Sequence, residues 1–161
     1  MMDTHLTQPF LKPKSIAIIG ASADPKKTGS RIQRFLVAHG YKGKIFPVNP
    51  NRDNIFGLKC YSNLKKIEEK VDHIFIAVDG DKIIASINDA ISIGVKCATI
   101  LSGGFSEAGL EGANLENKIL DIAQKGNLRI LGPNSIGIIN ISDSVILSAN
   151  AMLELPKLKK G

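Results

Sequence analysis

Short apolar segments alternate with amphipathic segments along most of the chain, and this alternation limits the possible folds more than any other feature. Residues 15–20 (SIAIIG) and 73–78 (HIFIAV) are apolar almost throughout, as strands covered on both faces are. After them, at residues 28–39 and 81–94, apolar side chains recur at helical spacing. This alternation predicts an α/β fold: Rossmann-like and doubly wound, with a mainly parallel sheet in three layers (α/β/α).

Further segments extend the pattern. The additional elements expected are strands at residues 44–50, 96–101, 128–131 and 136–140, a helix at about 113–125, and a connector with one short helical turn at 55–70. Pro47 favours an edge position for the second strand, because proline cannot donate a hydrogen bond to a neighbouring strand. Asp81 is expected to cap the helix that follows the third strand.

The length of 161 residues suits one folded domain. We expect that domain at residues 12–150, a flexible arm at 1–11, and at 151–161 either a frayed tail or the start of a second domain. No apolar run approaches the length that crosses a membrane, and the first residues lack the apolar core of a signal peptide. The sequence therefore predicts a cytoplasmic protein without a membrane partner.

Charge and cysteine content narrow the range of partners. The net charge of +6 favours anions in general, although a lysine-rich solvated surface has the same charge. Nucleic acid is not expected, because only six Phe and two Tyr occur and they are not interleaved with basic residues. Cys60 and Cys97 form no Cys-x-x-Cys pair, so we expect buried free thiols and no metal site.

Small and polar turn residues follow each of the first five predicted strands. In a doubly wound sheet, ligands bind outside the carboxyl ends of the strands, close to the point where the strand order reverses. The five ends read, in chain order, Gly20-Ala21-Ser22, Asn49-Pro50-Asn51-Arg52, Val78-Asp79-Gly80, Ser102-Gly103-Gly104 and Gly132-Pro133-Asn134-Ser135. A binding site is therefore expected along this edge of the sheet.

The loop at residues 20–29 (GASADPKKTG) has the features of an anion site, although it matches neither G-x-G-x-x-G nor the P-loop pattern. It places backbone N–H groups at the start of a helix, where the helix dipole favours negative charge. Its candidate binding residues are Gly20, Ala21, Ser22, Lys26, Lys27, Thr28 and Gly29. The expected ligand is a phosphate or diphosphate, and the alternative is an ordinary turn with solvated lysines.

The end of the second strand distinguishes between nucleotides. NAD sites place Asp or Glu there to hold the ribose diol, but this chain has Asn49 followed by Pro50 and Arg52. A guanidinium group suits phosphate oxygens, so Arg52 points to NADP or to another adenosine with a 2′- or 3′-phosphate. A surface arginine in a turn is the alternative.

Candidate catalytic groups are few. His5, His39 and His73 lie away from the carboxyl ends of the predicted strands. Glu107 and Glu111 could face a cleft, but glutamates in the first turn of a helix more often complement its dipole. We therefore predict a binding site and assign no catalytic residue.

Six segments between about Phe10 and Asn150 together resemble a known family. They are SIAIIGAS, GKIFPVNPN, GLKCYSNL, IAV, LSGGFSEAGLEG and LGPNSIGIIN. Their order and spacing are similar to those of the N-terminal CoA-binding domain of the nucleoside-diphosphate-forming acyl-CoA synthetases. That family includes the α subunit of succinyl-CoA synthetase and ADP-forming acetyl-CoA synthetase. The resemblance implies coenzyme A as the ligand.

The resemblance also implies a role for each strand end. Residues 20–29 would cradle the CoA phosphates, and Asn49, Pro50 and Arg52 would lie beside the phosphorylated ribose and the adenine. The other three ends would hold the rest of the molecule. The residues implied there are Ala77 and Val78 beside the adenine or pantetheine, Leu101, Ser102, Gly103 and Gly104 along the pantetheine arm, and Asn134 and Ser135 near the thiol.

Two departures from the family limit what the resemblance implies. Asp79 stands where relatives usually have proline, and an inward-pointing carboxylate would weaken the binding of an anion. The chain also shows no phosphohistidine motif and no nucleotide-grasp domain. It is therefore expected to bind CoA or acyl-CoA but not to catalyse, alone, the conversion of acyl-CoA, NDP and phosphate to acid, CoA and NTP. The remaining synthetase domains or subunits are possible partners.

Two other functions stay open. The first is an NADP-type Rossmann oxidoreductase or redox-sensing domain, which the loop at residues 20–29 and Arg52 would also suit. The second is a non-catalytic CoA-sensing interaction protein, which would account for Asp79 and for the missing domains.

Overall fold

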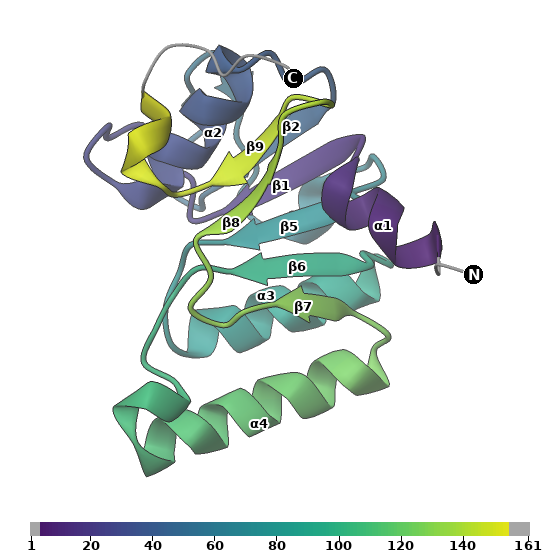
Figure 1. Cartoon of the computed structure of the whole chain (residues 1–161), viewed down its shortest axis with the longest axis vertical. Coiled ribbons are helices and arrows are strands. Elements are labelled where there is room, and N and C mark those ends of the chain that lie inside the picture. Colours follow the sequence, from purple (N-terminus) through teal and green to yellow (C-terminus); the bar gives the residue numbers. More distant parts are fainter. Residues whose placement is uncertain (1–3, 155–161) are drawn as a thin grey trace.

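A parallel sheet of five strands, in the order β2-β1-β5-β6-β7, runs through the centre of the protein (Figure 1). The computed structural model describes residues 4–154. The strands of this sheet are β1 (Ser15–Ile19), β2 (Lys44–Val48), β5 (His73–Ile76), β6 (Cys97–Ile100) and β7 (Arg129–Leu131). Each pairing between them is parallel, which confirms the predicted α/β fold, and β2 with its Pro47 lies at an edge.

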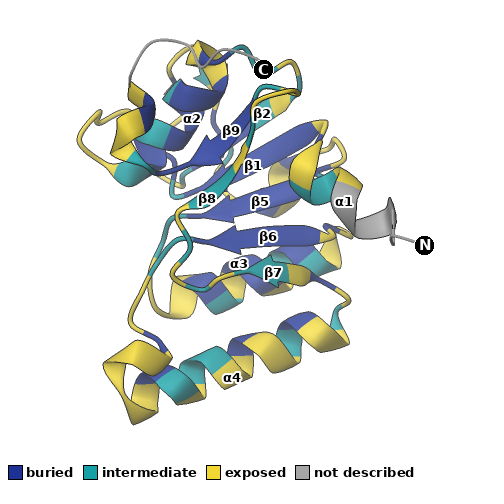
Figure 2. Ribbon diagram, in the orientation of Figure 1, coloured by how far each residue is buried: buried dark blue, intermediate teal, exposed yellow. Residues whose placement is uncertain are grey.

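Helices α3 (Asp81–Ser92) and α4 (Leu110–Lys125) cover one face of the sheet. Their apolar stripes face the strands, so Ile87 of α3 and Ile119 of α4 are fully buried with Ile74 of β5 in one core cluster. Figure 2 shows the same division, with buried residues along the sheet and exposed residues on the outer side of both helices. Both helices begin differently from the prediction. Gly80 rather than Asp81 occupies the N-cap of α3, and α4 begins at Leu110 instead of near residue 113.

The other face of the sheet is covered partly by a helix and partly by a hairpin. Helix α2 (Thr28–Ala38) agrees with the prediction, and beside it lie the antiparallel strands β8 (Gly137–Asn140) and β9 (Val145–Ser148). Ile16 of the sheet, Leu36 of α2 and Leu147 of β9 belong to one buried cluster. The strand expected at 136–140 therefore pairs with β9, which the sequence did not predict, and does not join the central sheet.

Short helices lie at both ends of the described part of the chain. Residues 4–11, expected as part of a flexible arm, form helix α1 (Thr4–Leu11). The Phe10 ring packs edge-on against the His73 ring, with 5.4 Å between the centroids. At the other end, the short helix η3 (Ala151–Glu154) begins the expected tail, and its Leu153 is buried against Phe35. The rest of the expected tail, and residues 1–3, lie outside the described residues.

The connector between β2 and β5 contains the predicted helical turn and a small hairpin that was not predicted. The turn is η1 (Leu64–Lys66), and the hairpin pairs β3 (Asn54–Ile55) with β4 (Leu58–Lys59). A second turn, η2 (Ser106–Ala108), lies between β6 and α4. Within residues 4–154, no helix is long and apolar enough to cross a membrane.

Candidate ligand site at the carboxyl edge of the sheet

A cavity of about 390 Å³ opens where the carboxyl ends of β1, β2 and β5 meet helix α3. The chain passes from β1 to its neighbour β2 through α2 and reaches its other neighbour β5 later, so the strand order reverses beside β1. The strand ends contribute Ile19, Gly20, Val48, Asn49, Pro50 and Val78 to the lining. The cavity therefore occupies the position at which doubly wound sheets bind ligands.

Gly20 brings the end of β1 close to the end of β5. Its φ of +83° suits glycine, and a Cβ atom there would lie 2.6 Å from the Ala77 carbonyl oxygen and 2.7 Å from Val78 Cγ1. The Gly20 N–H also donates to the carbonyl of Val48 at 3.1 Å, which joins the ends of β1 and β2. A residue with a side chain would force these three strand ends apart.

Asn49 fixes the loops after β1 and β2 to each other. Its side-chain N–H donates to the Ala21 carbonyl oxygen at 2.8 Å, and its Oδ1 accepts the Asn51 N–H at 2.9 Å. The amide is therefore used to hold the two loops, and no carboxylate takes its place to bind a ribose diol. Asp79 is exposed and lies outside the cavity lining.

The loop at residues 20–29 folds onto itself and delivers the start of α2 to the strand ends. Ser22 Oγ accepts the Asp24 N–H at 3.1 Å, and Asp24 Oδ1 accepts the Lys26 N–H at 3.0 Å. Lys27 occupies the N-cap of α2 without a side-chain capping hydrogen bond. Gly29 is packed so closely that a Cβ atom would overlap the Gly20 carbonyl oxygen. The first turn of α2 is thus fixed at the edge, where such turns offer N–H donors to anions.

The ends of β5, β6 and β7 are joined by hydrogen bonds between their loops. Ser102 Oγ donates to the Val78 carbonyl oxygen at 2.7 Å, and the Asn134 N–H donates to the Ser102 carbonyl oxygen at 3.0 Å. The Ser135 N–H donates to the carbonyl of Ile100 at 3.1 Å. Since these bonds cross two strand boundaries, the loops after the three strands form one connected surface.

The residues predicted from the sequence divide into three groups. Gly20, Asn49, Pro50 and Val78 line the cavity. The side chains of Ala21, Ala77 and Leu101 pack in the core on the α2 face, and none of the three lines the cavity. Outside the lining, on the loops of the same edge or in the first turn of α2, are Ser22, Lys26, Lys27, Thr28, Gly29, Arg52, Ser102, Gly103, Gly104, Asn134 and Ser135.

Several cavity residues were not predicted as site residues from the sequence. They are Ile19, Val48, Asn51, Ser62, Asn63, Leu64, Lys82, Ala85, Ser86 and Asp89. Lys82 and Asp89 lie on α3, and in the sequence each looks like an ordinary solvated helix position. In the structure Lys82 is exposed, whereas Asp89 is half-buried and forms an ion pair with Lys65 at 2.7 Å. Only the packing of α3 against the strand ends reveals that these side chains border a cavity.

One buried titratable group, the free thiol of Cys60, lies beside the cavity: its Sγ donates to the Asn49 carbonyl oxygen at 3.7 Å, and burial raises its pKa. Two others, His73 and Cys97, lie at the amino ends of their strands. His73 is fully buried at the amino end of β5, and burial lowers its pKa to about 4. Burial likewise raises the pKa of the Cys97 thiol to about 12. Across the described part of the chain, no group of three or more His, Cys, Asp and Glu residues could hold a metal ion.

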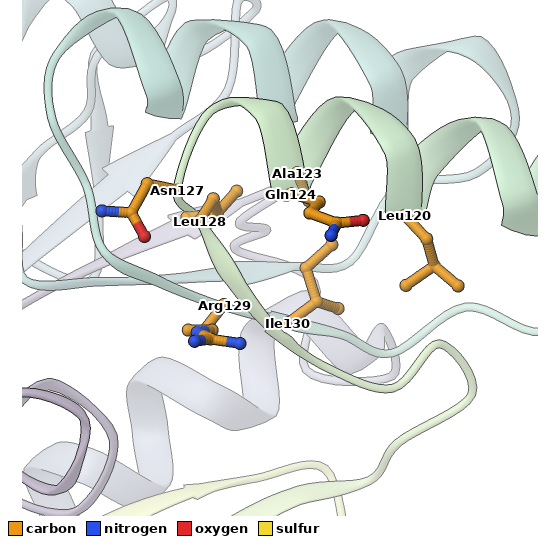
Figure 3. Close-up of a pocket in the computed structure, with 7 residues that line it drawn as sticks. All are labelled: Leu120, Ala123, Gln124, Asn127, Leu128, Arg129 and Ile130. Carbon is orange, nitrogen blue, oxygen red and sulfur yellow. The ribbon is translucent and has the colours of Figure 1, made fainter. Parts of the chain in front are cut away.

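A second hollow, of about 480 Å³, lies between α4 and the edge strand β7 (Figure 3). Leu120 and Gln124 of α4 lie above Ile130 of β7 in this view, and the hollow is lined mainly by these two elements. This hollow lies beside the edge strand β7, and none of the loops after the carboxyl ends of the strands lines it. The carboxyl edge is therefore the stronger candidate for a ligand site.

Comparison with known proteins gives consistent matches. The family model described as CoA binding domain matches residues 14–141. The ADP-forming acetate–CoA ligase II of Archaeoglobus fulgidus is 42% identical over 149 residues, which are 92% of this chain and 22% of that protein. Subunit alpha of the ADP-forming acetate–CoA ligase II of Pyrococcus furiosus is 38% identical over 131 residues, 81% of this chain and 28% of that protein.

A solved structure of similar fold agrees with these matches. The dinucleotide-forming acetyl-coenzyme A synthetase 1 of Ca. Korarchaeum cryptofilum, solved with phosphate and ADP, superimposes with a TM-score of 0.86 at 36% identity. The match covers 90% of this chain and 31% of that chain. The chain thus spans less than a third of the length of each of these three relatives.

Proposed function

Because the chain belongs to the CoA-binding domain family, we propose that the carboxyl edge of its sheet holds CoA. The observation that carries the proposal is the cavity at the reversal of strand order, beside the start of α2. The cavity offers an apolar floor, which includes Ile19 and Val48, and a polar rim, which includes Asn49 and Lys82. A nucleoside with a nearby phosphate has this combination of surfaces.

The loop at residues 20–29 would hold the diphosphate. Its N–H groups at the start of α2 and the exposed Lys26 and Lys27 would supply donors and positive charge. The adenosine would enter the cavity beside Asn49 and Pro50, with Arg52 on the exposed turn beyond them. The pantetheine arm would then cross residues 101–104 toward Asn134 and Ser135.

We further propose that the domain supplies the CoA site of an NDP-forming acyl-CoA synthetase. CoA would be a substrate of that reaction rather than a resident cofactor. The phosphoryl-transfer steps would belong to other domains or subunits, because the carboxyl edge described above holds binding groups and no catalytic set. One relative is itself described as a subunit alpha, which supports a role for separate subunits.

Calorimetric titration with CoA, dephospho-CoA and NADP tests the proposed ligand. We expect CoA to bind more tightly than dephospho-CoA, which lacks the 3′-phosphate, and more tightly than NADP, which lacks the pantetheine arm. No measurable CoA binding would overturn the proposal. Tighter binding of NADP than of CoA would instead favour a dinucleotide site.

The variant Arg52→Ala tests which residue binds the 3′-phosphate. Loss of a charged hydrogen bond should weaken CoA binding about tenfold and dephospho-CoA binding by less than about twofold. Lys42→Ala removes an exposed cation near the amino ends of β1 and β2, at the opposite edge of the sheet. It is the matched control and should change the affinity for neither ligand. Equal weakening of both ligands by Arg52→Ala would mean that another cation, with Lys82 the next candidate, binds this phosphate.

A further inference from the structure

The loop after β6 is exposed, yet it is held in place from several sides. Phe105 is only 1% exposed and anchors the loop in the core. Gly112 of α4 lies so close that a Cβ atom would overlap the Phe105 carbonyl oxygen. Glu116 Oε2, also on α4, accepts the Ser106 N–H at 3.1 Å. The loop therefore has a defined shape, and its exposed residues form part of the surface at the carboxyl edge of the sheet.

Glu107 lies at the corner between this loop and the loop after β7. Its Oε1 accepts the Gly104 N–H at 2.7 Å and lies 3.5 Å from the side-chain nitrogen of Asn134. Gly103 lies next to this contact. A Cβ atom on Gly103 would be 3.1 Å from the same Oε1 and 3.6 Å from Asn134 Oδ1, so a side chain there would crowd the carboxylate. One carboxylate oxygen thus contacts both loops.

This contact completes a series of hydrogen bonds along the edge of the sheet. Ser102 joins the end of β5 to the loop after β6 through Val78, and Asn134 joins the loop after β7 back to Ser102. Glu107 then connects Asn134 to Gly104. Without the Glu107 carboxylate, Asn134 would keep its backbone hydrogen bond to Ser102 but would lose its connection to Gly104.

We propose that Glu107 is a positioning residue, which holds the loops after β6 and β7 together as one surface for the arm of the bound ligand. This rests on the proposed binding of CoA at the same edge. Backbone N–H groups of Glu107 itself, Gly104 and Phe105 lower the pKa of the Glu107 carboxyl, so it is ionised at neutral pH. An ionised carboxylate that already accepts hydrogen bonds is suited to hold a loop rather than to transfer a proton.

Calorimetry with two ligands tests this role. CoA carries the pantetheine arm, whereas adenosine 3′,5′-bisphosphate has the nucleotide end of CoA without the arm. Glu107→Ala should weaken CoA binding about tenfold and bisphosphate binding by less than about twofold. Glu107→Gln should stay within about threefold of the wild-type CoA affinity, because its amide oxygen can still accept the Gly104 N–H. Glu111→Ala, which removes another exposed carboxylate from the start of α4, should leave both affinities unchanged.

The possible results separate this inference from the proposed function. If the wild-type chain binds CoA but Glu107→Ala binds it equally well, or loses both ligands to the same extent, Glu107 has no positioning role for the arm. If the wild-type chain binds neither ligand, CoA binding itself is wrong and this inference is overturned with it. Thermal denaturation of each variant shows whether a loss of affinity reflects a loss of fold.

Discussion

At the scale of single residues, Gly29 shows how closely α2 is packed on the end of β1. A Cβ atom on Gly29 would overlap the Gly20 carbonyl oxygen. This oxygen belongs to the backbone, so it cannot rotate away as the end of a flexible side chain could. Gly29→Ala should therefore lower the free energy of unfolding by about 1–3 kcal/mol, as overpacking in a core does. Urea denaturation measures this change. Val37→Ala, on the exposed face of the same helix, should have little effect, and an unchanged stability for Gly29→Ala would contradict the described packing.

His73 makes stability depend on pH. Its Nδ1 lies 3.0 Å from the Pro9 carbonyl oxygen and its Nε2 lies 2.8 Å from Thr99 Oγ1. The carbonyl can only accept, so Nδ1–H donates and the neutral Nε2 accepts from the Thr99 hydroxyl. Burial lowers the pKa of His73 from 6.5 to about 4, against smaller opposite effects of the Pro9 carbonyl and the charge of Asp72.

The sign of the effect follows from proton binding. The unfolded chain binds a proton to this imidazole near pH 6.5, whereas the folded chain does so only near pH 4. The free energy of unfolding should therefore be highest above pH 6.5 and fall as the pH approaches 4, by at most about 3 kcal/mol. Denaturation at pH 7.5 and pH 5 checks this, and His73→Gln should show a smaller difference between the two. The same difference in both proteins would rule out His73 as its source.

At the scale of elements, the hairpin of β8 and β9 replaces part of the helical layer on the α2 face. Leu147 is fully buried against the sheet, while Ile139 on the paired strand is 45% exposed. Leu147→Ala should lower the free energy of unfolding by about 3 kcal/mol, and Ile139→Ala by much less. Equal effects in thermal or urea denaturation would mean that the hairpin does not contribute its inner face to the core.

The elements also show what the sequence could and could not predict. The three central strands β1, β5 and β6 were recognisable because they are buried on both faces. The turn residues that follow the strands of the sheet also located the carboxyl edge. The hairpin was not predicted because, within the described residues, Val145 to Ser148 is followed only by the short helix η3 and not by an amphipathic helix, so it falls outside the alternation. The sequence pattern favours a first-turn helix position for Glu107. Its partner Asn134 lies 27 positions away, so no local pattern shows the contact between them.

At the scale of the whole molecule, the two edges of the sheet differ in chemistry. The carboxyl edge carries the glycine and asparagine turns around the cavity. The opposite edge gathers Lys12, Lys14, Lys42 and Lys44 around another hollow, although Lys12 and Lys44 form ion pairs with Asp143 and Glu69. Because CoA is a polyanion, exposed lysines could attract it without specificity. An experiment must therefore show where on the protein CoA binds, and not only that it binds.

The most direct test of the proposed site is an amide NMR spectrum of the chain titrated with CoA. We expect the resonances that shift to belong to the carboxyl edge, at residues 20–29, 49–52, 77–79, 101–107 and 134–135. Shifts confined to the lysines of the opposite edge, or no shifts at all, would contradict a CoA site at the carboxyl ends of the strands.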